Sequence, residues 1–181
     1  MAALELINHQ ELSGTATTMT YTSIPSTYKH LYFVASTKTD NASGNINMGV
    51  RFYTGSSSEV SSGYSGRFFK IGGYLAGSTP SGAAQSSQAQ WSLIYEMGDN
   101  LSQPTFTSTE FLIANYNTSN YKQMLSYGTG TGNSVSSGQY NVNQGAHLNT
   151  TTAAITGLKL MSIYGSFVQY STLTIYGLNG A

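Results

Sequence analysis

The chain has 181 residues, a net charge of zero and no cysteine, and only 8% of its residues are charged. The absence of cysteine excludes disulfides, thiolate catalysis and Cys-based zinc sites. Uncharged polar side chains must form most of the surface that faces water, because Ser (26), Thr (22), Asn (13) and Gln (9) supply 70 of the 181 positions. A protein with so little net charge associates readily, which favours a subunit of an assembly.

Apolar and polar residues alternate along most of the chain, and no segment shows convincing helical periodicity. In chain order, the alternation predicts half-buried strands within residues 18–22, 45–53, 90–97 and 172–175. The clearest of them turns four apolar side chains to one face: Ile46, Met48, Val50 and Phe52. Two continuous apolar runs, 31–35 and 111–114, predict strands that are covered on both faces.

Stretches rich in Gly, Asn and Ser separate these strands and favour turns, because such residues tolerate positive φ and form local hydrogen bonds. They are residues 39–44, 55–63, 77–84, 98–103, 115–120 and 128–138. We expect a single domain, residues 1–181, folded as an all-β antiparallel sandwich of two sheets with nine or ten strands and a jelly-roll-like path. Pro25 belongs at a strand entrance because it cannot donate a ladder hydrogen bond, and the first and last strands are expected to pair.

Motifs for phosphate binding and acyl transfer have simpler explanations. Residues 128–132 form a Gly-Thr-Gly-Thr-Gly run, but no helical pattern follows, so we expect a flexible loop there rather than a phosphate site. Two Ser-x-x-Lys spacings, 26–29 and 119–122, lack the companion motifs of that enzyme class. We expect both at strand starts, as chance matches in a serine-rich chain.

The histidines His9, His30 and His147 are too scattered to indicate a metal site. A Ser-His-Asp triad stays open, because its members meet only in space, although no Gly-x-Ser-x-Gly elbow occurs. Asp40 and Asp99 fall in predicted turns, where their expected role is to cap the turn.

A sugar-processing site is the remaining enzymatic alternative. Glu96 and Glu110 could form a glycosidase pair beside Trp91, but glutamates on a strand face are more often solvated or paired with Lys. Two aromatic groups could bind a sugar or a protein partner, although alternation turns half of each to the core: Tyr64, Phe68, Phe69 and Tyr74, and Tyr116, Tyr121, Tyr127 and Tyr140. We therefore expect no catalytic residue, no cofactor-binding residue, no metal site and no enzymatic activity.

Nucleic acid and membranes are not expected partners. The seven basic residues are balanced by seven acidic ones, so the chain lacks the excess of positive charge that binds nucleic acid. No apolar run approaches the roughly 20 residues of a membrane-spanning helix, and residues 1–5 lack the basic start of a secretory signal. Synthesis without secretion is the expectation.

Two blocks at opposite ends of the chain resemble small bacteriophage virion structural proteins. The first is TSIPSTYKHLYFVAS, residues 22–36, followed by Lys-Thr-Asp at 38–40. The second is AITGLKL, residues 154–160, which leads to GSFV at 165–168 and STLTIYGL at 171–178. Residues 55–144 carry no such likeness.

The resemblance implies a non-enzymatic virion component, made in the bacterial cytoplasm, and carries over no catalytic residue. Within the virion we predict a capsid decoration or cement protein that clamps neighbouring coat subunits and forms a homo-oligomer, most simply a trimer. The alternative is a tail-associated or fibre-associated protein that binds host surface glycans through exposed Tyr residues and Trp91. A polysaccharide-degrading enzyme on the same fold is the third reading.

Overall fold

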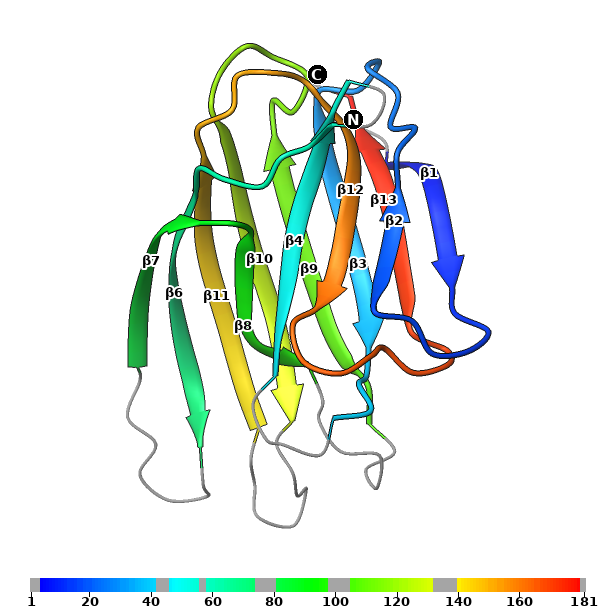
Figure 1. Cartoon of the computed structure of the whole chain (residues 1–181), viewed down its shortest axis with the longest axis vertical. Helices are drawn as coiled ribbons and strands as arrows, with labels where there is room; N and C mark the ends of the chain where they lie inside the picture. The colour runs from blue at the N-terminus through cyan, green and yellow to red at the C-terminus, as the bar shows by residue number, and fades with distance from the viewer. Residues whose placement is uncertain are drawn as a thin grey trace.

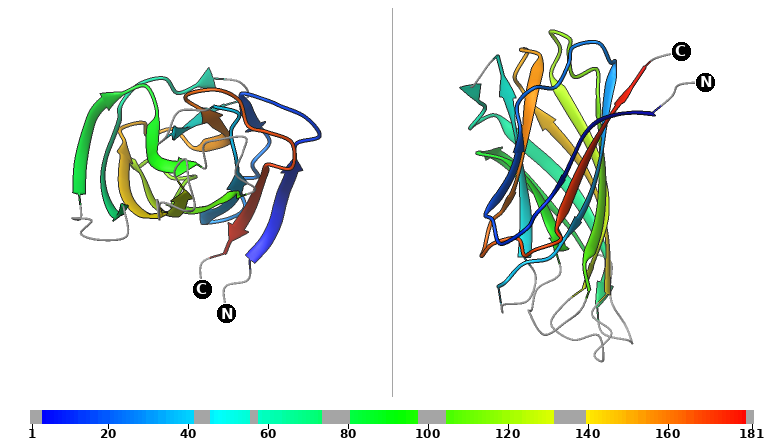
Figure 2. Two further views of the ribbon diagram at one scale, coloured as in Figure 1. Left: turned by 90° about the horizontal axis from the view of Figure 1, so that it is seen from below. Right: turned by 90° about the vertical axis from the view of Figure 1, so that its right-hand side faces the viewer.

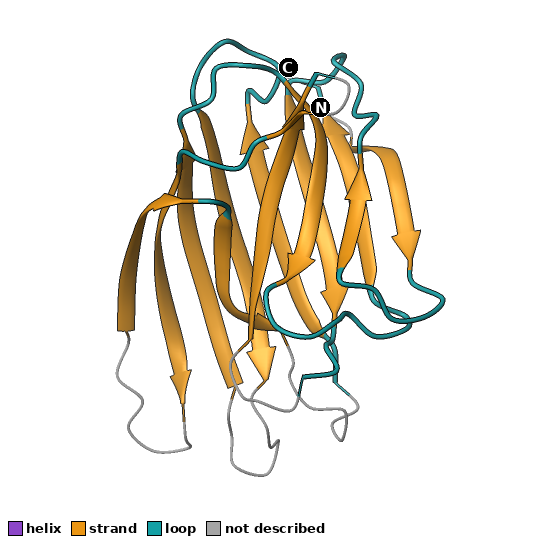
Figure 3. Ribbon diagram, viewed as in Figure 1, coloured by secondary structure: helices purple, strands orange, loops and turns teal. Residues whose placement is uncertain are grey.

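The computed structural model describes residues 4–41, 46–55, 58–73, 81–97, 105–131 and 140–179. These ranges form two antiparallel sheets and contain no helix, hence no helix that could cross a membrane (Figure 1 and Figure 3). The strands are β1 (Leu4–Glu11), β2 (Thr18–Tyr21), β3 (His30–Thr37), β4 (Ile46–Thr54), β5 (Ser58–Glu59), β6 (Tyr64–Gly73), β7 (Ser81–Gln88), β8 (Trp91–Met97), β9 (Thr107–Ala114), β10 (Lys122–Thr131), β11 (Tyr140–Asn149), β12 (Ile155–Ser162) and β13 (Thr172–Leu178).

The strand order is that of a jelly roll with two insertions. Four pairs close a long antiparallel ribbon: β1 with β13, β2 with β12, β3 with β9, and β4 with β8. The ribbon is rolled up because β13 also pairs with β3, and β12 also pairs with β4. Successive pairs of the ribbon therefore alternate between the two sheets and enclose one core, which confirms the predicted all-β sandwich.

The insertions add β6, β7, β10 and β11 to one sheet, whereas the short inserted strand β5 joins the other. The larger sheet has the order β1-β13-β3-β9-β10-β11-β6-β7, and the smaller has β2-β12-β4-β5 with β8 also paired to β4. The smaller sheet covers one side of the larger one (Figure 2). The opposite side of the larger sheet is its outer face.

The predicted count of nine or ten strands is too low, because polar segments read as turns are partly extended. Strand β5 lies within residues 55–63, and β7 begins within 77–84. The expected flexible loop at 128–132 is also wrong for residues 128–131, which continue β10. Backbone hydrogen bonds to a neighbouring strand hold these Gly-rich and Ser-rich segments, and side-chain alternation does not report such pairing.

Residues that alternate along the strands form the core as predicted. Met48, Val50 and Phe52 of β4 are fully buried, as are Leu173 and Ile175 of β13. The predicted pairing of the first and last strands is confirmed by the β1–β13 ladder, and Pro25 lies in the connection that enters β3. These contacts hold both ends of the described chain in the larger sheet.

The two continuous apolar runs behave differently from their prediction. In β3 the side chains of Leu31, Phe33 and Ala35 are buried, but Tyr32 and Val34 point to the outer face and are only half-buried. The same holds in β9, whose burial alternates along its length. The expectation of cover on both faces is therefore wrong for the isolated chain, because no second layer of described residues lies on the outer face.

Candidate functional site

One serine–histidine pair exists in the described chain, and it is buried between the sheets. Strand β10 turns Ser126 inward, β11 does the same for His147, and Ser126 Oγ lies 3.1 Å from His147 Nε2. The imidazole has room only because two neighbours are glycines. A Cβ would lie 2.4 Å from its Nε2 at Gly145 and 2.6 Å from its Nδ1 at Gly66.

The environment of this pair is unsuited to nucleophilic catalysis. Ser126 and His147 are 1% and 5% exposed, which leaves a substrate almost no surface of either residue to contact. Burial lowers the pKa of His147 to about 4, and the ring is therefore neutral at pH 7. Among the described residues, no carboxylate hydrogen-bonds to it in the orienting role that a triad requires. The pair serves as a satisfied polar contact in the core.

The other two histidines and the described aspartate make local structural bonds. His9 Nδ1 lies 2.8 Å from Thr174 Oγ1, and His30 Nδ1 accepts a hydrogen bond of 3.1 Å from the Asn115 amide. No group of three metal-ligating side chains occurs in the part of the chain that is described. Asp40 accepts from the Ser166 amide at 2.7 Å, a capping role, whereas Asp99 lies outside the described residues.

The candidate glycosidase pair and sugar cleft are not assembled by the described side chains. Trp91 is 1% exposed and donates from Nε1 to the Leu148 carbonyl at 2.9 Å, so its predicted role in a sugar cleft is wrong. Glu110 is exposed and accepts from the Tyr32 hydroxyl, which, with burial and the nearby charge, raises the pKa of Tyr32 to about 12. The side chain of Glu96 lies outside the described residues.

The Ser-x-x-Lys matches lie at strand starts, as expected. Lys122 is the first residue of β10, and its buried ammonium group donates to the carbonyls of Thr118 and Asn120. Burial lowers the pKa of Lys122. Residues 26–29 directly precede β3. The bonds of Lys122 close the 115–120 turn, so its ammonium group is engaged in structure.

The aromatic groups divide between core and surface. Tyr64 and Tyr116 are fully buried, whereas Phe69, Tyr121 and Tyr127 are exposed. The side chains of Tyr74 and Tyr140 are outside the described set. Phe68 is half-buried, so each group has one fully buried described member and the predicted half-and-half division is met only approximately.

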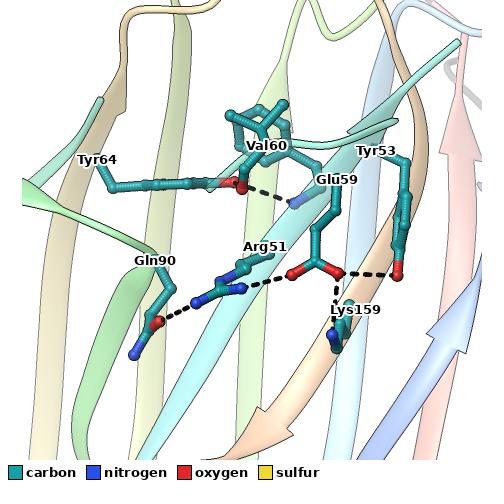
Figure 4. A network of polar contacts seen from close by, with 8 residues as sticks. Arg51, Tyr53, Glu59, Val60, Tyr64, Gln90 and Lys159 are labelled. Atoms are coloured by element: carbon teal, nitrogen blue, oxygen red, sulfur yellow. Dashed lines mark hydrogen bonds and ion pairs between the residues drawn. The ribbon is translucent and has the colours of Figure 1, made fainter. Parts of the chain in front are cut away.

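A charged network that the sequence did not indicate lies on the smaller sheet (Figure 4). Glu59 accepts from Arg51 Nη1 at 2.6 Å, from Lys159 Nζ at 2.9 Å and from the Tyr53 hydroxyl at 3.2 Å. Arg51 also donates from Nη2 to Gln90 Oε1 at 3.0 Å. Because Arg51 and Lys159 are paired in register, Glu59 separates two like charges that sheet geometry brings together.

Partial burial acts against ionisation of Glu59, but the hydrogen bonds and charges of Arg51 and Lys159 outweigh it and lower its pKa. The network fastens the short strand β5, which contains Glu59, to β4 and β12. Its signal in the sequence is weak, since the three charges are eight and one hundred positions apart.

We expect Glu59→Gln to lower the free energy of unfolding by about 1–2 kcal/mol, between the small value of exposed ion pairs and the large one of buried pairs. The lost carboxylate leaves the cations of Arg51 and Lys159 uncompensated. Urea unfolding at pH 7 measures the change, and Glu11→Gln, at an exposed position of β1, is the matched control. An equal effect of the two substitutions would contradict a stabilising network.

Two adjoining open depressions lie at the larger sheet. The first, of about 770 Å³, extends over β6, β7, β9, β10 and β11, and its floor includes Ala84, Ala114 and Ala146. The second, of about 480 Å³, lies at the start of β10 beside Tyr121 and Gln123.

Comparison of the chain with family models, curated proteins and solved structures finds no match. The candidate functional features of the described chain are the two depressions and the exposed side chains around them.

Proposed function

We propose that this chain is a non-enzymatic structural subunit of a bacteriophage particle, located in the virion. Its proposed role is that of a capsid decoration or cement protein, which binds the major capsid protein and clamps neighbouring coat subunits. It acts through contact surfaces, as a homo-oligomer and without a cofactor.

One observation carries the proposal: the segments that resemble phage virion proteins come together in space. Strand β3 of the first block pairs with β13 of the second from His30↔Leu178 to Ser36↔Thr172. The Ile24 amide donates to the Thr156 carbonyl at 2.9 Å.

The shorter pieces of the two blocks also meet. The Asp40 amide donates to the Ser166 carbonyl at 3.0 Å, and the Val168 amide donates to the Lys38 carbonyl at 2.9 Å. Pieces separated by more than a hundred residues thus build one structural unit. This supports the proposal, because a resemblance limited to a shared framework is expected to occupy residues that contact each other.

A tail-associated protein that binds host glycans is the second candidate, favoured by the smaller depression. Tyr121 is 57% exposed there, and the amide side chains of Asn115, Asn120 and Gln123 line the same hollow. An aromatic ring beside several amides is suited to stacking and hydrogen bonding with a sugar. Tyr121→Ala would then reduce binding to host cells, whereas a cement protein would retain its function.

The test is the position of the chain on particles purified from the phage that encodes it. Mass spectrometry is expected to find the chain in many copies, and cryo-electron microscopy is expected to place it on the capsid shell. Asp40→Asn should leave its incorporation largely intact, because the asparagine side-chain oxygen can still accept the hydrogen bond of the Ser166 amide. Density at the tail alone would favour the glycan-binding alternative, and absence from the particles would overturn both.

A further inference from the structure

The outer face of the larger sheet carries an unusually apolar row of side chains. Register pairs the members of this row from strand to strand across the whole sheet: Leu6, Tyr176, Tyr32, Leu112, Leu125, Ala146, Arg67 and Ala84. A neighbouring row contains Val34, Glu110, Tyr127, Gln144 and Phe69. Antiparallel sheets commonly keep a polar face toward water, and the first of these rows does not follow that rule.

Large apolar groups on this face remain accessible in the single chain. Leu125 is 49% exposed, Tyr127 47% and Phe69 43%. They lie next to the half-buried Tyr32 and Leu112 of the continuous apolar runs. Contiguous apolar patches of this kind mark protein interaction sites. The pattern of β3 and β9 predicts a covered face, and no described residue of the chain supplies the cover.

The face combines a hollow with large exposed rings. Ala84, Ala114 and Ala146 keep the surface low in the larger depression. Tyr127 and Phe69 project beside it, aligned through their common neighbour Gln144. A second copy placed face to face can therefore insert its projecting rings where the first copy is hollow.

The two charged groups near the centre of the face are of opposite sign. Arg67 of β6 and Glu110 of β9 are both exposed, and neither forms an ion pair with a described residue. Two strands, β10 and β11, separate them, and they lie in neighbouring rows, so they are roughly 16 Å apart at the usual strand and residue spacings. A two-fold axis that passes between them, in the plane of the contact, sets Arg67 of each copy opposite Glu110 of the other.

The size of the face suits a stable contact. Eight strands about 4.8 Å apart are about 38 Å wide, and four rows of outward side chains extend about 20 Å along the strands. The resulting plane area of the whole face is about 760 Å², so a standard interface of roughly 800 Å² per partner would cover most of it.

We infer that the outer face of the larger sheet is the contact surface for a second copy of this chain, packed face to face across a two-fold axis. The inference rests on the self-association in the proposed function but not on the assignment to a phage. An even number of copies follows, in contrast to the trimer predicted from the sequence, so the molar mass separates the two.

Sedimentation and light scattering of the purified chain are expected to give twice the 19.3 kDa monomer mass at micromolar concentration. Leu125→Glu should raise the dissociation constant at least about tenfold, because it places two like charges in the apolar centre of the contact. Tyr164→Glu, at an exposed position in the connection between β12 and β13, is the matched control and should leave the dimer intact. Circular dichroism and thermal unfolding verify that both variants fold.

A charge exchange tests the two-fold arrangement itself. Arg67→Glu and Glu110→Arg should each weaken the dimer, since each creates like-charge pairs, and the double variant should restore it. If a different protein covered Arg67 and Glu110, or if the dimer used a different face of the chain, the double variant would not restore the dimer.

A monomeric wild-type chain, a trimer, or a dimer insensitive to Leu125→Glu would each overturn the inference. Failure of the proposed function is seen separately, as absence of the chain from purified particles. A dimer that depends on Leu125 but is missing from particles would uphold this inference and overturn the phage assignment.

Discussion

Phe52→Ala is expected to lower the free energy of unfolding by about 3–5 kcal/mol, through lost burial and the cavity left behind. Phe52 is fully buried, and its ring lies 5.2 Å from that of Tyr64 and 5.0 Å from that of Trp91. The aromatic cluster joins the smaller sheet to the inserted strand β6, so the cavity opens where the two layers meet. A loss of this size is a large part of the stability of an ordinary domain.

Urea unfolding at one fixed protein concentration measures this effect, since association also adds to apparent stability. Circular dichroism and the fluorescence of Trp91, the single tryptophan, report the transition. Phe106→Ala removes the same atoms from a ring that is 37% exposed, and should cost less than about 1 kcal/mol. Similar losses for the two variants would contradict the core position of Phe52.

Acid is expected to destabilise the protein through His147. The folded state holds the pKa of this buried imidazole at about 4, below the ordinary value of 6.5, whereas the unfolded chain binds the proton near 6.5. The stability is therefore fully present above pH 6.5 and falls as the pH drops toward 4. Linkage gives a loss of about 2 kcal/mol between about pH 7.5 and pH 5.

The measurement is the free energy of unfolding by urea at several pH values in that window. His147→Gln keeps a side chain that can hydrogen-bond Ser126 but does not titrate, so the slope should largely disappear. His9→Gln removes an exposed histidine instead and should retain the slope. An unchanged slope in His147→Gln would show that other groups cause the acid sensitivity.

Most of the sandwich core could be predicted from the sequence, because a period of two is a local property of the chain. Strand β4 shows this, since the apolar side chains of Met48, Val50 and Phe52 form its buried side. The strand entrance at Pro25 is likewise a local consequence of a missing amide proton. Strands β5 and β7 were missed, because their Ser-rich and Gly-rich sequences contain no alternation and acquire extended structure only from a neighbouring ladder.

The candidate site was less predictable than the fold. Sequence reasoning identified Tyr121 and Tyr127 as possible contact residues but also placed Trp91 in a sugar cleft, where the structure buries it. Its polar indole nitrogen finds a backbone carbonyl inside the core, an outcome that depends on β11 lying near β8. The preference for contact surfaces over chemistry came from composition and from the resemblance, and it remains a prediction.

By itself, the sequence determined that the chain is all-β, which side of its clearly alternating strands is buried, and that it carries few charges. The tertiary structure alone decided which strands are neighbours and in what register. That register joins Ser126 to His147, surrounds Glu59 with two cations, and aligns Leu112, Leu125 and Ala146 into an apolar row. The physical reason is that alternation arises within one strand, whereas pairing depends on contacts between residues far apart in the chain.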